Sequence, residues 1–230
     1  MARTKWLISL LLPLWLLVAP AWATADADAA DPTATSGAKS AAESTAAQEF
    51  NLSQLQQQLA AHALVKGDFT QVRHMAMFNQ PLSSSGQFVL SRELGLWWQQ
   101  IQPFPVSLIL TQDTLSQQFG DDSPQLMSAE ENPMVFYFSH LFLSLFQGDT
   151  QKLQQQFEVS LSGTASHWQL LLTPKHPPLT QVFASIALSG GADLDTLVLS
   201  ELRGDSTEIH FQHQSHPSEL TQDERSVFAL

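Results

Sequence analysis

The feature that most constrains the fold is an alternation of apolar and polar residues with a period of two. Val106, Leu108 and Leu110 occupy every second position of one run, and residues 157–162 and 168–172 repeat the pattern. Loops with Pro, Gly or Asp separate such runs at intervals of roughly ten residues. Successive side chains of a β-strand point to opposite faces of a sheet. The chain therefore predicts about ten strands in an antiparallel meander, each with one apolar face.

Two segments instead show helical spacing. Residues 48–66 carry leucines three or four positions apart, with Asn51 or Ser53 at the expected start and Gly67 at the expected end. Residues 133–146 are apolar on almost every side, which is typical of a helix buried on more than one side. That segment is too short to cross a bilayer. Neither helix connects neighbouring strands as a βαβ unit would, so we expect a mainly β domain with two main helices.

The N-terminus predicts export. Arg3 and Lys5 precede an apolar run, and an A-x-A site ends at Ala23. This is the pattern of a secretory signal peptide over residues 1–23, and the apolar run is too short and wrongly flanked for a membrane anchor. We expect cleavage after Ala23, with a later cut near Ala27 as the alternative.

Composition limits what the exported chain can do. Residues 24–47 are rich in Ala, Ser, Thr and Asp and predict a disordered linker, which leaves residues 48–230 as the folded domain. The chain has no cysteine, so we expect no lipid-anchor cysteine, no disulfide and no thiolate chemistry. The formal net charge of −12 does not suit nucleic-acid binding, which relies on basic side chains. A soluble monomer is expected.

Residues 67–103 hold an ordered set of short motifs. The set begins with G-x-F-x-Q at residues 67–71. It continues with a Ser-rich turn, a glycine and a strand that ends in arginine, over residues 81–92. It closes with G-x-x-W at residues 95–98, shortly before a proline. This ordered set resembles the LolA family of periplasmic carriers for outer-membrane lipoproteins, and the order of elements extends the resemblance over residues 46–215.

The resemblance implies both a shape and a function. The shape is a single curved antiparallel sheet, an open and incomplete β-barrel, with helices covering the concave face. The function is that of a periplasmic carrier, not an enzyme, which binds acyl chains of a lipoprotein or another lipid in an apolar cavity for transfer toward the outer membrane. An inner-membrane exporter and an outer-membrane acceptor are the implied partners. No nucleotide-binding or catalytic motif lies in an ordered context, so no cofactor is expected.

Other functions stay open from the residues alone. The same fold would suit an accessory or sensor protein of an envelope lipid or pigment export system. A periplasmic acyl hydrolase is a third alternative, although no nucleophile motif supports it. The helix at residues 133–146 is either a buried core helix or a lid over a lipid cavity, and the resemblance favours the lid.

Arg92 is the most specific candidate residue. By alternation it shares a face with Phe88 and Leu90, and a strand-end arginine often simply reaches water. The resemblance implies that Arg92 donates hydrogen bonds to backbone carbonyls of the lid and holds it shut. The family has proline after this arginine, whereas this chain has Glu93, which we expect to pair with Arg92. The predicted lid and cavity residues are Phe69, Met75, Phe88, Leu90, Arg92, Trp98, Leu108, Met134, Phe138, Phe142 and Phe146.

The choice of Met75, and of Trp98 beside Trp97, rests on alternation. Met75 is included because it shares a face with Phe69 if that strand continues unbroken. Trp97 and Trp98 are adjacent, so they point to opposite faces, and one of them lines the inner face.

Three histidines complete the set of candidates. His210, His213 and His216 follow one another in steps of three, but in the predicted strand His213 points away from the other two. No cysteine and no recognisable carboxylate spacing accompany them, so no metal site is predicted.

Overall fold

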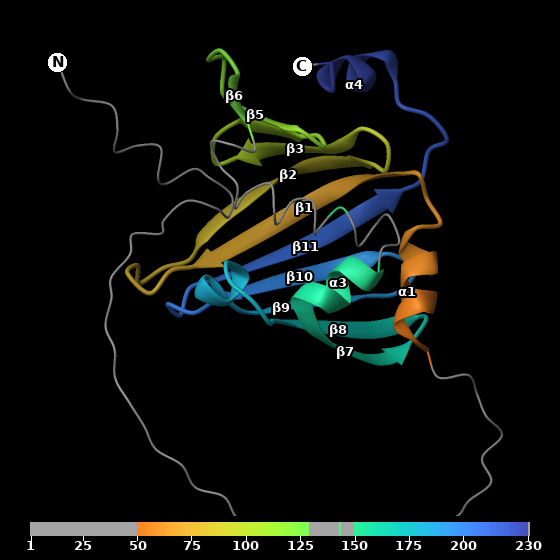
Figure 1. Ribbon diagram of the computed structural model, residues 1–230. Helices are drawn as coiled ribbons and strands as arrows, with labels where there is room; N and C mark the ends of the chain where they lie inside the picture. The colour runs from red at the N-terminus through yellow and green to blue at the C-terminus, as the bar shows by residue number, and fades with distance from the viewer. Residues whose placement is uncertain (1–49, 129–142, 144–149, 230) are drawn as a thin grey trace, which may run out of the picture. The chain divides into compact units, whose positions relative to one another are not determined.

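A computed structural model describes residues 50–128, 143 and 150–229 (Figure 1). The predicted signal peptide and linker lie outside these residues. So does the helix predicted at residues 133–146, apart from Leu143, which is helical and buried. Among the described helices, none has the length and apolarity needed to cross a bilayer.

Over the described residues, eleven strands form one antiparallel sheet that does not close, which confirms the predicted fold class. Strands β1 to β6 follow one another as one meander, and β7 to β11 form a second. The two meanders meet where β1 pairs with β11, so the sheet runs β6-β5-β4-β3-β2-β1-β11-β10-β9-β8-β7. The strands are β1 Leu64–His74, β2 Leu82–Ser91, β3 Gly95–Gln102, β4 Val106–Leu110, β5 Thr114–Phe119, β6 Gln125–Ser128, β7 Phe157–Thr164, β8 His167–Pro174, β9 Phe183–Gly190, β10 Leu194–Glu201 and β11 Ser206–Ser215.

One face of this sheet, here called the inner face, carries the core. Along β8, Trp168, Leu170 and Leu172 are buried and their neighbours are exposed. Register continues this face across the sheet, because Leu170 pairs with Leu188 and Leu188 pairs with Leu197. Helix α3 (Thr150–Gln156) lies in front of this part of the bent sheet in Figure 1. Its buried Leu153 contributes to the core.

Helix α1 (Leu52–Leu59) is shorter than predicted. Its start confirms the prediction, because Asn51 forms a capping box with Gln54. Its predicted end at Gly67 is wrong, since the helix stops at Leu59 and β1 begins at Leu64. Leu64 and Val65 pair with β2 instead of extending the helix, and both side chains become buried. This apolar burial outweighs the helical hydrogen bonds that a longer α1 would form.

The C-terminal segment packs on the opposite face of the sheet. Helix α4 (Gln222–Val227) is the last described helix and follows β11. A short 3₁₀ helix, η2 (Leu179–Gln181), lies earlier, between β8 and β9. Phe228, directly after α4, is buried against Leu64 and Val89. Phe228 therefore anchors the C-terminal segment to the sheet.

Candidate functional site

Four aromatic rings meet on the inner face, where the two meanders join. They belong to β1, β2, β3 and β11, and they are Phe69, Phe88, Trp98 and Phe211. The rings of Phe69 and Trp98 stack with their centroids 3.6 Å apart, and Phe88 meets Phe211 edge to face at 5.2 Å. The ring quadrupole favours the edge-to-face arrangement of Phe88 and Phe211, which adds to the free energy of apolar burial. We call these four residues the aromatic cluster.

Two glycines of the sequence motif make room for this cluster. A Cβ atom on Gly67 would lie 3.0 Å from Cε1 of Phe88 and 2.8 Å from the carbonyl oxygen of Gln212. Gly86 pairs with Phe69, and a Cβ atom there would lie 1.9 Å from the carbonyl oxygen of Gln99. The two glycines therefore allow close approach of the chain at the cluster.

The predicted site residues divide into three groups. Phe69, Phe88 and Trp98 lie together in the aromatic cluster. Leu90 is buried and Leu108 is partly buried on the same face, where Leu108 pairs with Trp98. The predicted lid residues lie outside the described residues: they are Met134, Phe138, Phe142 and Phe146.

Met75 does not continue the strand of Phe69. Strand β1 ends at His74, and the amide of Phe78 donates to the carbonyl oxygen of Met75 in a turn. The amide of Ala76 also donates to the carboxylate of Asp205, at 2.8 Å. The condition for placing Met75 on the inner face, an unbroken strand, is therefore not met.

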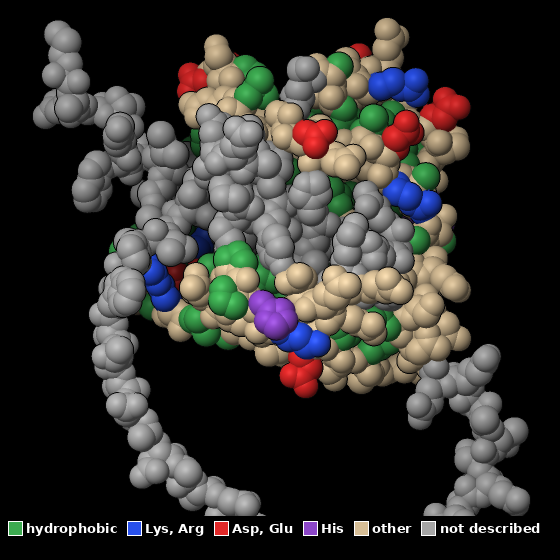
Figure 2. Space-filling model, viewed as in Figure 1, with side chains coloured by type: hydrophobic (Ala, Val, Ile, Leu, Met, Phe, Trp, Pro, Cys, Tyr) green, Lys and Arg blue, Asp and Glu red, His purple; other side chains and the backbone are tan. Residues whose placement is uncertain are grey.

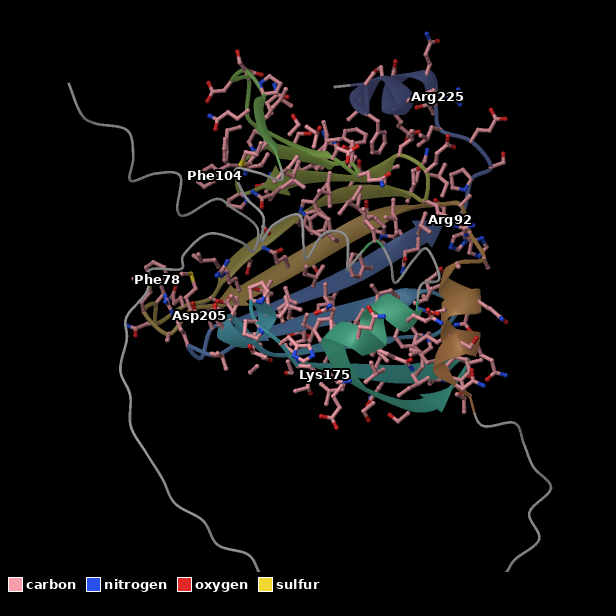
Figure 3. The ribbon with its side chains drawn as sticks, viewed as in Figure 1. Phe78, Arg92, Phe104, Lys175, Asp205 and Arg225 are labelled. Atoms are coloured by element: carbon pink, nitrogen blue, oxygen red, sulfur yellow. The ribbon has the colours of Figure 1, made fainter. Side chains whose placement is uncertain are left out.

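Arg92 lies in the exposed turn directly after β2, at the end of the sheet opposite Phe78 (Figure 3). Its guanidinium donates to the carbonyl oxygen of Ala60 and, at 3.2 Å, to that of His62. Ala60 is the C-cap of α1, so Arg92 supports the end of that helix. Arg92 and Glu93 form no ion pair in the described part of the chain. The lid lies outside it, and the latch remains a prediction.

Trp97 and Trp98 face opposite sides of the sheet, as predicted. Trp98 belongs to the aromatic cluster on the inner face. Trp97 packs instead against the apolar group of Phe228, Leu64 and Val89, and its indole nitrogen donates to Ser107 Oγ at 3.0 Å.

A group of polar side chains beside the aromatic cluster was not predicted. Along β1 the inner side chains continue from Phe69 to Gln71 and Arg73. Ser84 of β2 lies opposite Gln71, and Thr207 of β11 lies opposite Arg73. We call Gln71, Arg73, Ser84 and Thr207 the polar patch.

The charge of Arg73 is balanced by Glu201 of β10. Nitrogen Nη2 of Arg73 lies 3.2 Å from Oε1 of Glu201, and both side chains are mostly buried. Burial raises the pKa of Glu201. Arg73 acts in the opposite direction, Asp205 adds to the increase, and Arg203 lowers the pKa again.

Sequence signals for Phe211 and the polar patch were present but incomplete. Phe211 alternates with Ile209, which marks an inner-face position on its strand. Nothing in the sequence places β11 beside β1, however, and this pairing is what brings Phe211 to Phe69 and Thr207 to Arg73.

The three histidines do not form one site. His210, His213 and His216 each face a different carboxylate, at 2.8 to 2.9 Å. These carboxylates belong to Glu208, Asp68 and Asp193. Within the described ranges, no group of three or more His, Cys, Asp or Glu side chains is arranged to hold a metal ion.

Comparisons with known proteins give a family match and distant structural neighbours. The family model described as "Outer membrane lipoprotein carrier protein LolA-like" matches residues 42–212. No curated protein matches. Similar solved structures include a DUF1329 family protein from Desulfovibrio piger, with 12% identity over 77% of this chain and 96% of that chain and a TM-score of 0.44. A LolA superfamily protein from Nitrosomonas europaea has 7% identity over 75% and 94% of the two chains and a TM-score of 0.43.

These structural similarities are too distant to add to the functional argument. The family match spans most of the chain, including every strand from β1 to β10. The chain belongs to the family of LolA-like outer membrane lipoprotein carrier proteins.

Proposed function

We propose that this chain binds acyl chains of a lipoprotein or another lipid on the inner face and carries them through the periplasm toward the outer membrane. The aromatic cluster is the observation that supports this function most directly. Acyl chains offer no polar contacts, so they bind through apolar area. The four rings converge at the centre of the sheet. They are 1% to 9% exposed in this structure, so in this proposal they supply that area only when the lid opens.

In this proposal the predicted residues have distinct roles. Phe69, Phe88, Leu90, Trp98 and Leu108 contact the acyl chain on the sheet side. The helix at residues 133–146 covers the chain as a lid, and Arg92 holds that lid shut until cargo arrives. Opening of the lid would release cargo, as a shift between two packings. An inner-membrane exporter would supply the lipid and an outer-membrane acceptor would receive it.

The two adjacent tryptophans provide a direct test. Brominated fatty acids quench tryptophan fluorescence on contact, and Trp98 lies on the inner face whereas Trp97 lies on the other. In chains that begin at Thr24, we expect Trp97→Phe to retain saturable quenching and Trp98→Phe to lose a large part of it. Equal quenching in both variants, or none, would contradict binding on the inner face.

Native cargo can be identified in parallel. The protein is purified from the periplasm and extracted, and the extract is measured by mass spectrometry. We expect a lipid with at least one acyl chain at near-stoichiometric amounts. Absence of extractable lipid together with absence of fatty-acid binding would reject carriage and favour an accessory or sensor protein.

A further inference from the structure

The inner face changes in character along β1. Toward the β1–β2 hairpin, the apolar surface around Phe69 gives way to the polar patch. The hairpin lies at the same end of the sheet as Phe78 and Asp205 in Figure 3. A row of inner-face positions runs through Leu170, Leu188 and Leu197 before it reaches Gln71. Apolar residues fill most of this row, so the polar side chains at its β1 end call for an explanation.

Each member of the polar patch has a buried atom without a hydrogen-bond partner in the part of the chain that the structure describes. These atoms are Gln71 Oε1, Arg73 Nε, Ser84 Oγ and Thr207 Oγ1. Gln71 is 8% exposed and Thr207 is 1% exposed. Native proteins keep few such atoms, because a buried polar atom without a partner has lost its hydration. Four of them on one contiguous surface indicate that a bound group supplies the missing partners.

The unpaired atoms define the chemistry of that group. Nε of Arg73 donates and needs an acceptor, whereas Oε1 of Gln71 accepts and needs a donor. The hydroxyls of Ser84 and Thr207 can do either. Glu201 already balances the charge of Arg73, so a neutral group fits better than an anion. A secondary amide has both a carbonyl acceptor and an N–H donor, whereas an ester has only acceptors.

We propose that the polar patch is a binding site for a secondary amide at the head of an acyl chain whose tail lies on the aromatic cluster. This inference rests on the proposed function and adds the class of head group to it. The distance from tail to head is short, because Phe69 and Gln71 are two positions apart on one strand and face the same side. The amide belongs either to an acylated amino group of a protein or to an N-acyl lipid.

Two matched probes test the inference. They are the N-methyl amide and the methyl ester of one pyrene-labelled fatty acid. The two differ only in that the ester has an oxygen atom where the amide has its N–H group. We expect the protein purified from the periplasm, after delipidation, to bind the amide at least about five-fold more tightly, since a site built for a hydrogen bond discriminates against a ligand that lacks it.

Three small substitutions locate the preference. Gln71→Leu should weaken amide binding about three- to ten-fold and leave ester binding within about two-fold, because only the amide has the N–H that Oε1 of Gln71 accepts. Thr207→Val and Ser84→Ala should weaken binding of both probes, because a hydroxyl can donate to the carbonyl oxygen of either one. The matched control is Thr70→Val, which should change neither affinity. Thr70 is exposed, precedes Gln71 on β1 and faces the other side of the sheet. The midpoint of unfolding without ligand should stay or rise in Thr207→Val and Gln71→Leu, because each removes an unpaired buried atom.

The outcomes separate the two proposals. If neither probe binds, the proposed function fails and this inference fails with it. If both probes bind equally, acyl binding stands, the polar patch holds only water, and this inference is wrong. Lower unfolding midpoints in all three variants, together with an amide preference that Gln71→Leu leaves unchanged, would also overturn it. An N-acylated dipeptide and an N-acyl ethanolamine as competitors then show whether the amide comes from a protein or a lipid.

Discussion

Arg92 shows how one side chain can serve the end of a helix from a neighbouring turn. Its guanidinium reaches two carbonyl oxygens at the C-terminus of α1, where carbonyl groups lack helical partners. A cation there also interacts favourably with the helix dipole. Arg92 therefore joins α1 to the β2–β3 turn, whatever its relation to the lid.

Replacing Arg92 should weaken this junction. We expect Arg92→Leu to lower the free energy of unfolding by about 1 kcal/mol, since the hydrogen bonds are charge-assisted but solvent-exposed. Arg92→Lys is the matched control: it keeps the charge, loses the fork of donors, and should cost about half as much. Denaturant unfolding measures both effects. Wild-type stability in Arg92→Leu would contradict the junction, and unchanged lipid uptake in the same variant would reject the latch.

Residue-level prediction from sequence succeeded where a single strand sufficed. Phe69, Phe88 and Trp98 follow from alternation within one strand each, together with the motif, and the structure brings them together. Phe211 and Thr207 depend on which strand lies beside β1, and alternation does not determine strand order. The motif contains Gln71 but does not predict that it is buried beside Ser84, because this depends on the register between β1 and β2.

At the scale of elements, helix α4 is joined to the sheet by an apolar group beside it and by a polar contact. Phe228 packs against Leu64 and Val89, and the amine of Lys66 on β1 donates to the carboxylate of Glu224. Burial raises the pKa of Glu224, but the hydrogen bonds from Lys66 and Thr221 outweigh it and lower the pKa below the ordinary value. The α4 contact is therefore sensitive to acid.

The sign of this effect follows from linkage. Glu224 has a lowered pKa in the folded state, so its contribution to stability is present above the ordinary pKa of 4.5 and is lost as the pH falls below that value. We expect wild type to lose about 2 °C more in melting temperature than Glu224→Gln between pH 6 and pH 3.5. Asp223→Asn is the matched control, because Asp223 does not pair with Lys66. Equal acid sensitivity of wild type and Glu224→Gln would contradict the contact.

Element boundaries show where local sequence rules reach their limit. Asn51 starts α1 as its side chain predicts, since a cap depends on residues within one turn. The end of α1 was predicted seven residues too late, because the four residues after Leu59 remain compatible with a helix. What ends the helix is the pairing of Leu64 and Val65 with β2, a contact between residues that are far apart in sequence.

At the scale of the whole molecule, the sheet consists of two meanders joined by one pair of strands. Strands β1 to β6 pair only with their neighbours in sequence, as do β7 to β11, and β1 with β11 is the one described exception. The aromatic cluster lies across this junction, with Phe69, Phe88 and Trp98 from one meander and Phe211 from the other. A bound acyl chain would therefore contact both halves of the sheet.

A disulfide across the junction tests this organisation. Thr70 and His210 are directly opposite each other on β1 and β11, and both are exposed or half-exposed. The chain has no cysteine, so Thr70→Cys with His210→Cys creates the only thiol pair. Directly opposed strand residues have Cβ atoms about 5 Å apart, close enough for a disulfide after a small adjustment. The bond would close a loop of about 140 residues, for which chain entropy predicts a gain of up to about 5 kcal/mol.

The oxidised variant should thus resist guanidinium more than its own reduced form, which is the matched control with the same side chains. Acyl-chain binding should be equal in the two forms, because the disulfide lies on the face opposite the aromatic cluster and fixes a pairing that is already present. Failure of the bond to form would show that the register of β1 and β11 is wrong. Loss of lipid uptake only on oxidation would show instead that the two meanders separate when cargo enters, and that the junction acts as a hinge in addition to the lid.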